Sequence, residues 1–207
     1  MSAADQQSIH VGRQAGMAWQ RPEQPIRHDL AETAAPGAAI SPGALRRTCG
    51  LFVTGVTVIT TGTGARAAGA TVNSFTSVSL EPPLVLFCLH ERSRLHETLA
   101  ESGAFTVNFL AGWQEGVARA FAGRDTAVFH HVEHHVSTMG VPVLSDVLAF
   151  LACRIVDRFV GGDHVIILGE VVELGEPRWH REPLIFFQGA FGALERDSPA
   201  HSQIPDG

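Results

Sequence analysis

The chain is organised around Gly69-Ala70-Thr71-Val72-Asn73-Ser74-Phe75-Thr76-Ser77-Val78-Ser79-Leu80-Glu81-Pro82-Pro83. A short apolar strand runs into a loop of small and hydroxyl-bearing residues, and two prolines close that loop. Small residues let a flat ligand lie close to the backbone, where amide groups and hydroxyls can bind its polar edge. The alternative interpretation is a Ser/Thr-rich turn between two strands. Phosphate-binding glycine loops do a related job, but their Gly-x-x-x-x-Gly-Lys pattern is absent from the sequence.

Strands are predicted on both sides of this stretch. Residues 52–61 are dense in Val, Ile and Thr, with Gly55 as a candidate bulge, and they form a hairpin with residues 65–72. Residues 84–89 are apolar at every position, which predicts a strand buried on both faces. Residues 105–109 alternate between apolar and polar side chains, the pattern of a half-buried strand.

The C-terminal half is also rich in predicted strands. Residues 148–160 form a long strand, Gly161-Gly162-Asp163 a turn, and residues 164–174 the antiparallel partner, while residues 184–187 form a last core strand. About six strands joined mostly by turns indicate a mostly β fold, an antiparallel barrel rather than a doubly wound sheet. No Gly-x-Gly-x-x-Gly follows a strand, so a Rossmann dinucleotide site is not supported.

Capping signals predict three short helices. Residues 41–50 begin with a Ser-Pro pair, typical of an N-cap and a first helical position, and end at Gly50, which suits a left-handed cap. Residues 93–103 begin with Ser93 as the N-cap and carry two leucines that face the core. Residues 113–123 place a Trp, a Val and a Phe four residues apart, which marks the third helix.

Composition excludes several classes of partner. The chain has 207 residues, a hydrophobic fraction of 45% and a net charge of −6, and every basic side chain other than His is Arg. Without a basic stripe, nucleic acid is not an expected partner. Because no run of about 18 apolar residues occurs, no membrane span is expected either. Three widely spaced cysteines fit neither a disulfide framework nor a zinc site.

The length predicts one domain with extensions at its ends. Residues 1–40 are rich in Ala, Gln, Pro, Gly and Arg without a sustained period, so we expect a flexible N-terminal leader, with a partner-binding arm as the alternative. Residues 41–195 form the predicted domain, and residues 196–207 a polar C-terminal tail. The first residues lack the apolar segment of a signal peptide, so we expect a cytoplasmic protein.

Four histidines occur close together at His130, His131, His134 and His135. Their spacing allows a pair at i, i+4 on a helical turn, as some metal sites use. The nearest carboxylate, Glu133, points elsewhere on such a helix, and no other ligand cluster is visible. We therefore expect a solvated His-rich loop and no metal, and keep metal binding as the alternative.

Six short segments, taken together, resemble the short-chain flavin reductases, which are the reductase components of two-component flavin-dependent monooxygenases. The segments occur in the family's order between about Arg46 and Leu194, and residues 1–40 lie outside the resemblance. They are Thr54-Gly55-Val56-Thr57-Val58-Ile59-Thr60, the stretch Asn73-Ser74-Phe75-Thr76-Ser77-Val78-Ser79-Leu80-Glu81-Pro82-Pro83-Leu84, Ser102-Gly103-Ala104-Phe105-Thr106-Val107-Asn108, Phe121-Ala122-Gly123, Gly162-Asp163-His164 and Gly189-Ala190-Phe191. The resemblance implies an FMN-binding split β-barrel of Greek-key type with a few short helices.

The resemblance also implies a flavin site on the loop from Thr71 to Ser79, within residues 69–83, here called the central stretch. Family members carry the flavin ring there, with backbone amides facing its polar edge, and amide donors stabilise the negative charge that develops near N1. Arg92-Ser93-Arg94 at a helix N-terminus would bind the flavin phosphate, and we favour Ser93 and Arg94 for this role over two solvated arginines beside a capped helix. The implied cofactor-binding residues are Ala70, Thr71, Val72, Asn73, Ser74, Ser77, Val78, Ser79, Cys88, Ser93 and Arg94.

The nicotinamide of NADH or NADPH is expected beside a tight turn. The family places Gly162, Asp163 and His164 near this ring, and His164 is the candidate catalytic residue, although a His in a turn is usually a surface residue. Phe191 stands where the family often has Tyr, so a stacking surface remains but a hydroxyl is lost.

The implied activity is that of an NAD(P)H:flavin oxidoreductase. It would reduce FMN or FAD by hydride transfer and release reduced flavin, by diffusion, to a partner monooxygenase; the cofactor carries the redox chemistry. The sequence does not choose between FMN and FAD or between NADH and NADPH. The family is dimeric, so a homodimer is expected. Two alternatives remain open: a split-barrel flavoprotein that keeps its flavin and acts directly on an organic substrate, and a non-enzymatic flavin- or haem-binding module.

Overall fold

The computed structural model describes residues 39–123, 129, 131–176 and 182–194. Contacts divide the chain into two units, residues 1–40 and residues 41–207. Nearly all of the expected leader and the whole expected C-terminal tail lie outside the described residues, so both stay predictions.

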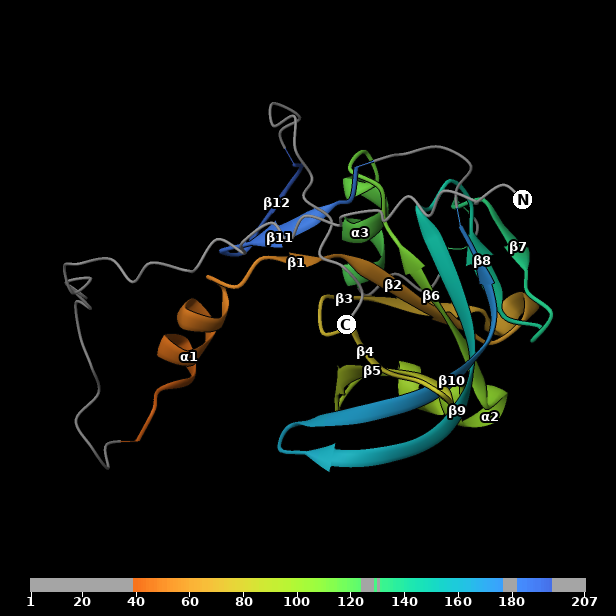
Figure 1. Cartoon of the computed structure of the whole chain (residues 1–207), viewed down its shortest axis with the longest axis horizontal. Coiled ribbons are helices and arrows are strands. Elements are labelled where there is room, and N and C mark those ends of the chain that lie inside the picture. The colour runs from red at the N-terminus through yellow and green to blue at the C-terminus, as the bar shows by residue number, and fades with distance from the viewer. Residues whose placement is uncertain (1–38, 124–128, 130, 177–181, 195–207) are drawn as a thin grey trace, which may run out of the picture. The chain divides into compact units, whose positions relative to one another are not determined.

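The main body is a seven-stranded sheet in which every neighbouring pair is antiparallel (Figure 1). In spatial order its strands are β3 (Ala68–Val72), β2 (Thr57–Thr61), β6 (Ala104–Phe109), β9 (Ala149–Gly161), β10 (His164–Gly175), β5 (Pro83–His90) and β4 (Thr76–Leu80). The predicted mostly β, antiparallel fold is confirmed. Among the described residues, β3 and β4 are edge strands that do not pair with each other, so the split barrel and its Greek-key connection stay predictions.

Two small sheets adjoin this body. They consist of β1 (Thr54–Gly55), β11 (Ile185–Phe187) and β12 (Ala190–Gly192) in one, and β7 (His134–Val136) and β8 (Pro142–Leu144) in the other. The expected single strand 52–61 is therefore wrong. It divides at Val56, whose N–H donates to the Leu184 carbonyl and whose carbonyl accepts from the Leu110 N–H, each at 3.1 Å. The expected core strand 184–187 likewise belongs to the small sheet.

Three α-helices are found in the described residues: α1 (Pro42–Cys49), α2 (Leu95–Ser102) and α3 (Glu115–Ala122), with a short 3-10 turn at Gly64–Arg66. Ser41 caps α1 as predicted, but Gly50 is right-handed (φ −64°), so the left-handed cap is wrong. The predicted N-cap of α2 is off by one: Arg94 is the N-cap, and the Ser93 hydroxyl accepts from the Leu95 N–H at 3.3 Å. No helix in the described part of the chain is long and apolar enough to cross a membrane.

Burial differs from the sequence pattern in two strands. In β6 every residue except Phe109 is buried, because β6 is a central strand between β2 and β9. The predicted half-buried strand is therefore wrong here. In β5 only every second residue is fully buried, so the prediction of burial on both faces is also wrong. Its inner residues Val85, Phe87 and Leu89 join Phe105 in the larger core cluster.

A buried asparagine joins β6 to two other strands. Asn108 is fully buried, and its Nδ2 donates to the Val58 carbonyl at 2.9 Å and to Thr60 Oγ1 at 3.0 Å. Its Oδ1 accepts from the Leu144 N–H at 2.8 Å. These three bonds join β2, β6 and β8 one residue before Phe109, which ends β6 and contacts Phe75 of the central stretch.

Candidate functional site

The central stretch contains much less loop than its composition suggested. Residues 68–72 form the edge strand β3 and residues 76–80 the edge strand β4, so only Asn73, Ser74 and Phe75 lie between the strands. The sequence predicted a loop up to the two prolines, and this prediction is wrong for the second half of that loop. There the pairing of Thr76 with Leu86 makes the chain a strand. A register shift between Ser77 and Ser79 leaves Val78 as an extra residue. Such bulges are frequent beside functional sites.

All three loop residues use their side chains to bind the body of the protein. Asn73 Nδ2 donates to Thr54 Oγ1 at 3.3 Å. The Ser74 hydroxyl donates to the carbonyl of Cys88 and accepts from its N–H, each at 3.0 Å. The Phe75 ring packs edge-to-face on Phe109 at 5.0 Å between centroids. The loop is thus anchored to three different strands, β1, β5 and β6.

The backbone of this loop has few internal partners. Within the described residues, no backbone carbonyl accepts from the amides of Asn73, Ser74 or Phe75. Donors of this kind, on an edge of the sheet, fit the polar edge of a flavin ring. Two hydroxyl-bearing residues predicted to bind the flavin differ in their surroundings. Thr71 Oγ1 already donates to the Ala118 carbonyl at 2.7 Å, whereas Ser77 lies exposed on β4.

The remaining predicted ring contacts lie on the same two edge strands and on β5. Ala70 and Val72 are half-buried residues of β3, and Ser79 is a half-buried residue of β4. Cys88 is half-buried on β5, where burial raises the pKa of its thiol. Since its backbone, not its thiol, binds Ser74, Cys88 belongs to the site through the main chain.

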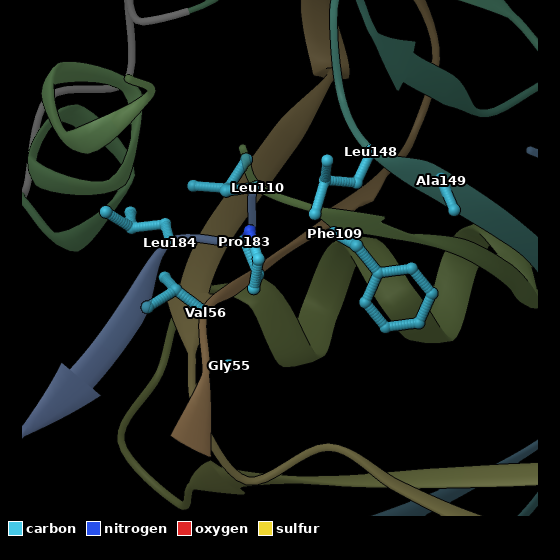
Figure 2. Close-up of a pocket in the computed structure, with 8 residues that line it drawn as sticks. All are labelled: Gly55, Val56, Phe109, Leu110, Leu148, Ala149, Pro183 and Leu184. Atoms are coloured by element: carbon cyan, nitrogen blue, oxygen red, sulfur yellow. The ribbon is translucent and has the colours of Figure 1, made fainter. Parts of the chain in front are cut away.

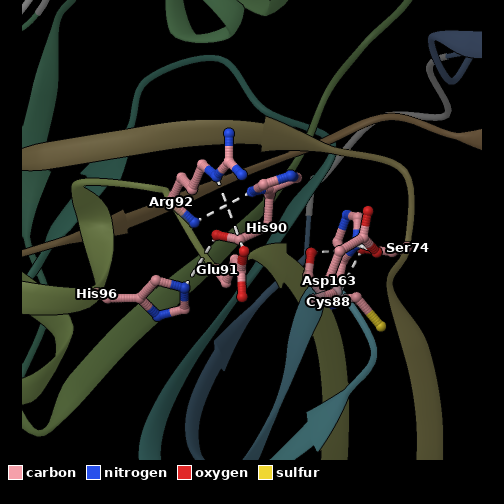
Figure 3. A network of polar contacts seen from close by, with 8 residues as sticks. Ser74, Cys88, His90, Glu91, Arg92, His96 and Asp163 are labelled. Atoms are coloured by element: carbon pink, nitrogen blue, oxygen red, sulfur yellow. Dashed lines mark hydrogen bonds and ion pairs between the residues drawn. The ribbon is translucent and has the colours of Figure 1, made fainter.

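The predicted phosphate-binding residues lie where β5 leads into α2. Ser93 is half-buried, and Arg94 is exposed and, within the described residues, takes part in no ion pair. His90 orders this corner. Its Nδ1 accepts from the Arg92 N–H at 3.1 Å (Figure 3). Its carbonyl accepts from the Ser93 N–H at 2.9 Å. An exposed cation and a helix N-terminus fit a phosphate group.

The predicted nicotinamide turn joins β9 to β10 and lies beside this corner. Gly162 has a φ of +70°, which suits the first position of a two-residue hairpin turn. His164 Nδ1 is 2.8 Å from Asp163 Oδ1, and the hydrogen bond from His164 lowers the pKa of that carboxyl, with a further contribution from its charge. His164 lies opposite His90 in the β10–β5 register, with ring centroids 5.2 Å apart.

Phe191, also predicted to lie near the nicotinamide, has its contacts in a different part of the chain. It is a residue of β12, where its ring packs on Phe186 at 5.5 Å, and the Arg119 guanidinium lies 5.2 Å from its centroid. None of these contacts involves the turn at Gly162–Asp163. The structure thus brings Ser74, Cys88 and the corner around His90 and His164 together on β5 and its neighbours, and it does not bring Phe191 to them within one chain.

An apolar pocket beside the loop was not predicted from the sequence. Its volume is about 280 Å³. Figure 2 shows the side chains that line it. Phe109, which lines it, contacts Phe75 of the loop, and Gly55, also in its lining, follows the Thr54 that binds Asn73. The pocket is lined by Gly55, Val56, Phe109, Leu110, Leu148, Ala149, Pro183 and Leu184. In the sequence these residues have the pattern of ordinary core positions, so no local signal predicts that they line a pocket.

The histidine cluster has a different geometry from the one considered above. His134 and His135 lie on the exposed strand β7, so His131 and His135 do not share a helical turn. His130 lies outside the described residues. In the described part of the chain no three His, Cys, Asp or Glu side chains are grouped so that they could hold a metal ion.

Comparison with known proteins identifies the family. The flavin reductase like domain matches residues 49–195. The reductase subunit HsaB of a flavin-dependent monooxygenase from Mycobacterium tuberculosis is 36% identical over 167 residues, 79% of this chain and 89% of the relative. An NADH-dependent flavin reductase of a Rhodococcus species is 38% identical over 168 residues, 77% of this chain and 92% of the relative.

A solved structure agrees with these matches. The NADH:FAD oxidoreductase SgcE6 of Streptomyces globisporus, in complex with NAD and FAD fragments, superposes with a TM-score of 0.71 at 39% identity. The superposition covers 78% of this chain and 99% of that chain. With a matching domain over residues 49–195, two relatives above 30% identity and a shared fold, this chain belongs to the flavin reductase-like domain family.

Proposed function

We propose that this protein is an NADH-dependent flavin reductase that reduces FMN or FAD and supplies reduced flavin to a partner monooxygenase. The observation that carries the proposal is the loop of Asn73, Ser74 and Phe75, whose side chains bind three strands and leave its amides without backbone partners. The relatives named for NADH-dependent flavin reduction and for a monooxygenase reductase subunit support the donor and the partner.

In this proposal the chain's residues position two ligands. The loop amides and the exposed Ser77 bind the polar edge of the flavin, and Ser93 and Arg94 bind its phosphate. The turn at Gly162–Asp163, with His164, holds the nicotinamide. With both ligands bound, NADH would supply the hydride and the flavin ring would be its acceptor. Neither ring gives up a proton to the protein in that transfer, so His164 serves to position the nicotinamide.

Asp163 supports His164 in this role. The hydrogen bond to Asp163 requires the proton of a neutral His164 to lie on Nδ1, which leaves Nε2 as an acceptor. Because the pKa of Asp163 is lowered, its carboxylate stays ionised at neutral pH, and the pair is lost only when the pH falls through that lowered pKa.

We further propose that the protein forms a homodimer. Helix α1 has only eight residues and buries none of them within the described chain. Helices this short are not stable alone in water, so α1 needs a covering surface. Next to it Leu51 and Phe52 are 60% and 77% exposed, and Val160 at the tip of the β9–β10 hairpin is 87% exposed. A second copy would cover these apolar side chains in a symmetric interface.

A steady-state assay tests the proposed activity. Oxidation of NADH and of NADPH is measured with FMN and with FAD as acceptors, in all four combinations. We expect turnover with NADH and added flavin, and a colourless protein after gel filtration. A protein that stays yellow and turns over only its own flavin would instead be a flavoprotein acting directly on an organic substrate. No oxidation of either nicotinamide with either flavin would refute the proposal.

Light scattering tests the dimer. We expect a mass of about twice the 22.1 kDa of one chain at micromolar concentration. A mass near 22.1 kDa would contradict the homodimer without affecting the proposed activity.

A further inference from the structure

The loop residue Ser74 occupies a place in the sheet that normally belongs to backbone. In the β4–β5 ladder, Ser77 lies opposite Val85 and Thr76 opposite Leu86. Continuing this register by two residues on each strand places Ser74 opposite Cys88. In an antiparallel ladder two such residues exchange N–H and C=O hydrogen bonds.

At this position the Ser74 side chain replaces the missing backbone pair. Its hydroxyl donates to the Cys88 carbonyl and accepts from the Cys88 N–H, both at 3.0 Å (Figure 3). Both polar backbone atoms of Cys88 on this side of β5 are thereby paired. One hydroxyl group thus makes the two hydrogen bonds to Cys88 that the N–H and C=O of a strand residue would otherwise make.

The Ser74 side-chain bonds leave the loop backbone free from pairing with β5 at this position. Because the side chain binds β5, the N–H and C=O of Ser74 are not used there, and the chain can leave β5 toward β3. The neighbouring side chains of Asn73 and Phe75 are directed to Thr54 and Phe109. With all three side chains engaged, what the loop offers a ligand is its backbone amides.

We propose that Ser74 is a positioning residue for flavin: its contact with the backbone of Cys88 holds the amides of residues 73–75 in the conformation that binds the polar edge of the ring. This differs from a direct hydroxyl contact with the ligand, because the hydroxyl has already used its proton and one of its two lone pairs. The proposal rests on the proposed flavin-reductase function.

Substitutions at position 74 test the role of the hydroxyl. Ser74→Ala removes both bonds and leaves the polar backbone atoms of Cys88 unpaired, and we expect the dissociation constant of FMN to rise about tenfold. Riboflavin, which has the ring but no phosphate, should lose affinity by the same factor. Ser74→Thr keeps the hydroxyl and should recover most of the loss. Thr63→Ala, at the opposite end of the β2–β3 hairpin, is the matched control and should bind FMN like the parent.

Several results would overturn the inference. Parent affinity in Ser74→Ala would show that the contact does not order the ligand-binding conformation. A loss for FMN without a loss for riboflavin would mean that Ser74 acts on the phosphate. An equal loss in Ser74→Thr and Ser74→Ala would exclude the hydroxyl as the cause. If Ser74→Ala does not fold, Ser74→Cys, which keeps the volume but only a weak donor, replaces it in the same comparison.

Amide hydrogen exchange separates this inference from the proposed function. Without any flavin, exchange of the Cys88 N–H should be at least about tenfold faster in Ser74→Ala than in the parent, since its acceptor is gone. Unchanged exchange would remove the contact itself. A parent protein that shows slow Cys88 exchange but neither binds nor reduces flavin would instead remove the proposed function.

Discussion

Replacing Asn108 with Ala should destabilise the protein more than any other single truncation of a polar side chain in the described core. The change removes three hydrogen bonds, to Val58, Thr60 and Leu144, at distances of 2.8 to 3.0 Å. It leaves the Leu144 N–H and one Val58 lone-pair site without partners in a fully buried place, and an unpaired buried group costs about 1–3 kcal/mol. With the small cavity added, we expect a loss of about 3 kcal/mol in the free energy of unfolding.

The assay is guanidinium unfolding, with the midpoint and the slope fitted separately. For a chain of this size, about 3 kcal/mol corresponds to a fall in melting temperature of roughly 6–12 °C. Thr106→Val is the matched control: Thr106 is also fully buried on β6, but its hydroxyl has no partner in the described residues. We expect Thr106→Val to be neutral or stabilising. A loss below about 1 kcal/mol for Asn108→Ala, or an equal loss in both variants, would refute the reasoning.

Three further predictions concern the site and the thiols. Arg94→Ala should weaken FMN binding about ten- to a hundredfold, measured by fluorescence titration, and leave riboflavin binding nearly unchanged; an equal loss for riboflavin would mean that Arg94 shapes the corner and does not bind phosphate. His164→Ala should slow flavin reduction by up to about a hundredfold and raise the apparent KM for NADH with flavin affinity unchanged, while His164→Asn recovers part of the loss; parent kinetics in the Ala variant would make His164 a turn residue only. In the native protein Cys88 and Cys153 should react slowly with a disulfide reagent, because burial raises the pKa of Cys88 and raises the pKa of Cys153 to about 12. Rapid reaction of all three thiols before unfolding would contradict this burial.

The parts of the fold that could be predicted from the sequence are those with local signals. The long β9–β10 hairpin agrees with the prediction to within about one residue at each end, because Gly161-Gly162-Asp163 is a strong turn signal between two segments rich in apolar residues. The ends of α2 and α3 follow from Gly103, with a φ of +65°, and from Gly123. Here the backbone conformation depends on residues close in sequence.

The parts that could not be predicted depend on distant partners. Residues 52–61 look like one strand, but bonds from Val56 to Leu184 and Leu110 divide it between two sheets. Residues 76–80 look like a loop, and pairing with β5 makes them a strand. The burial of β6 follows from its central position, not from its alternating sequence.

The candidate site likewise has parts that could be predicted from the sequence and parts that depend on distant partners. The resemblance to the family indicated the loop around Ser74 and the turn before His164. These two segments lead into β4 and β10, the two strands that adjoin β5. The contact between Ser74 and the backbone of Cys88, fourteen residues apart, has no signature in the sequence because any residue offers the same backbone atoms. The apolar pocket beside Phe109 is likewise formed by segments far apart in the chain.

We expect the protein to reduce flavin with NADH and to release the reduced flavin. An anaerobic titration tests it most directly: a small amount of protein is mixed with a large excess of FMN or FAD, and the bleaching of the flavin is followed as NADH is added. We predict that many flavin molecules are reduced per protein chain, with one NADH consumed for each. Bleaching that stops after one flavin per chain, or no bleaching at all, would contradict the account.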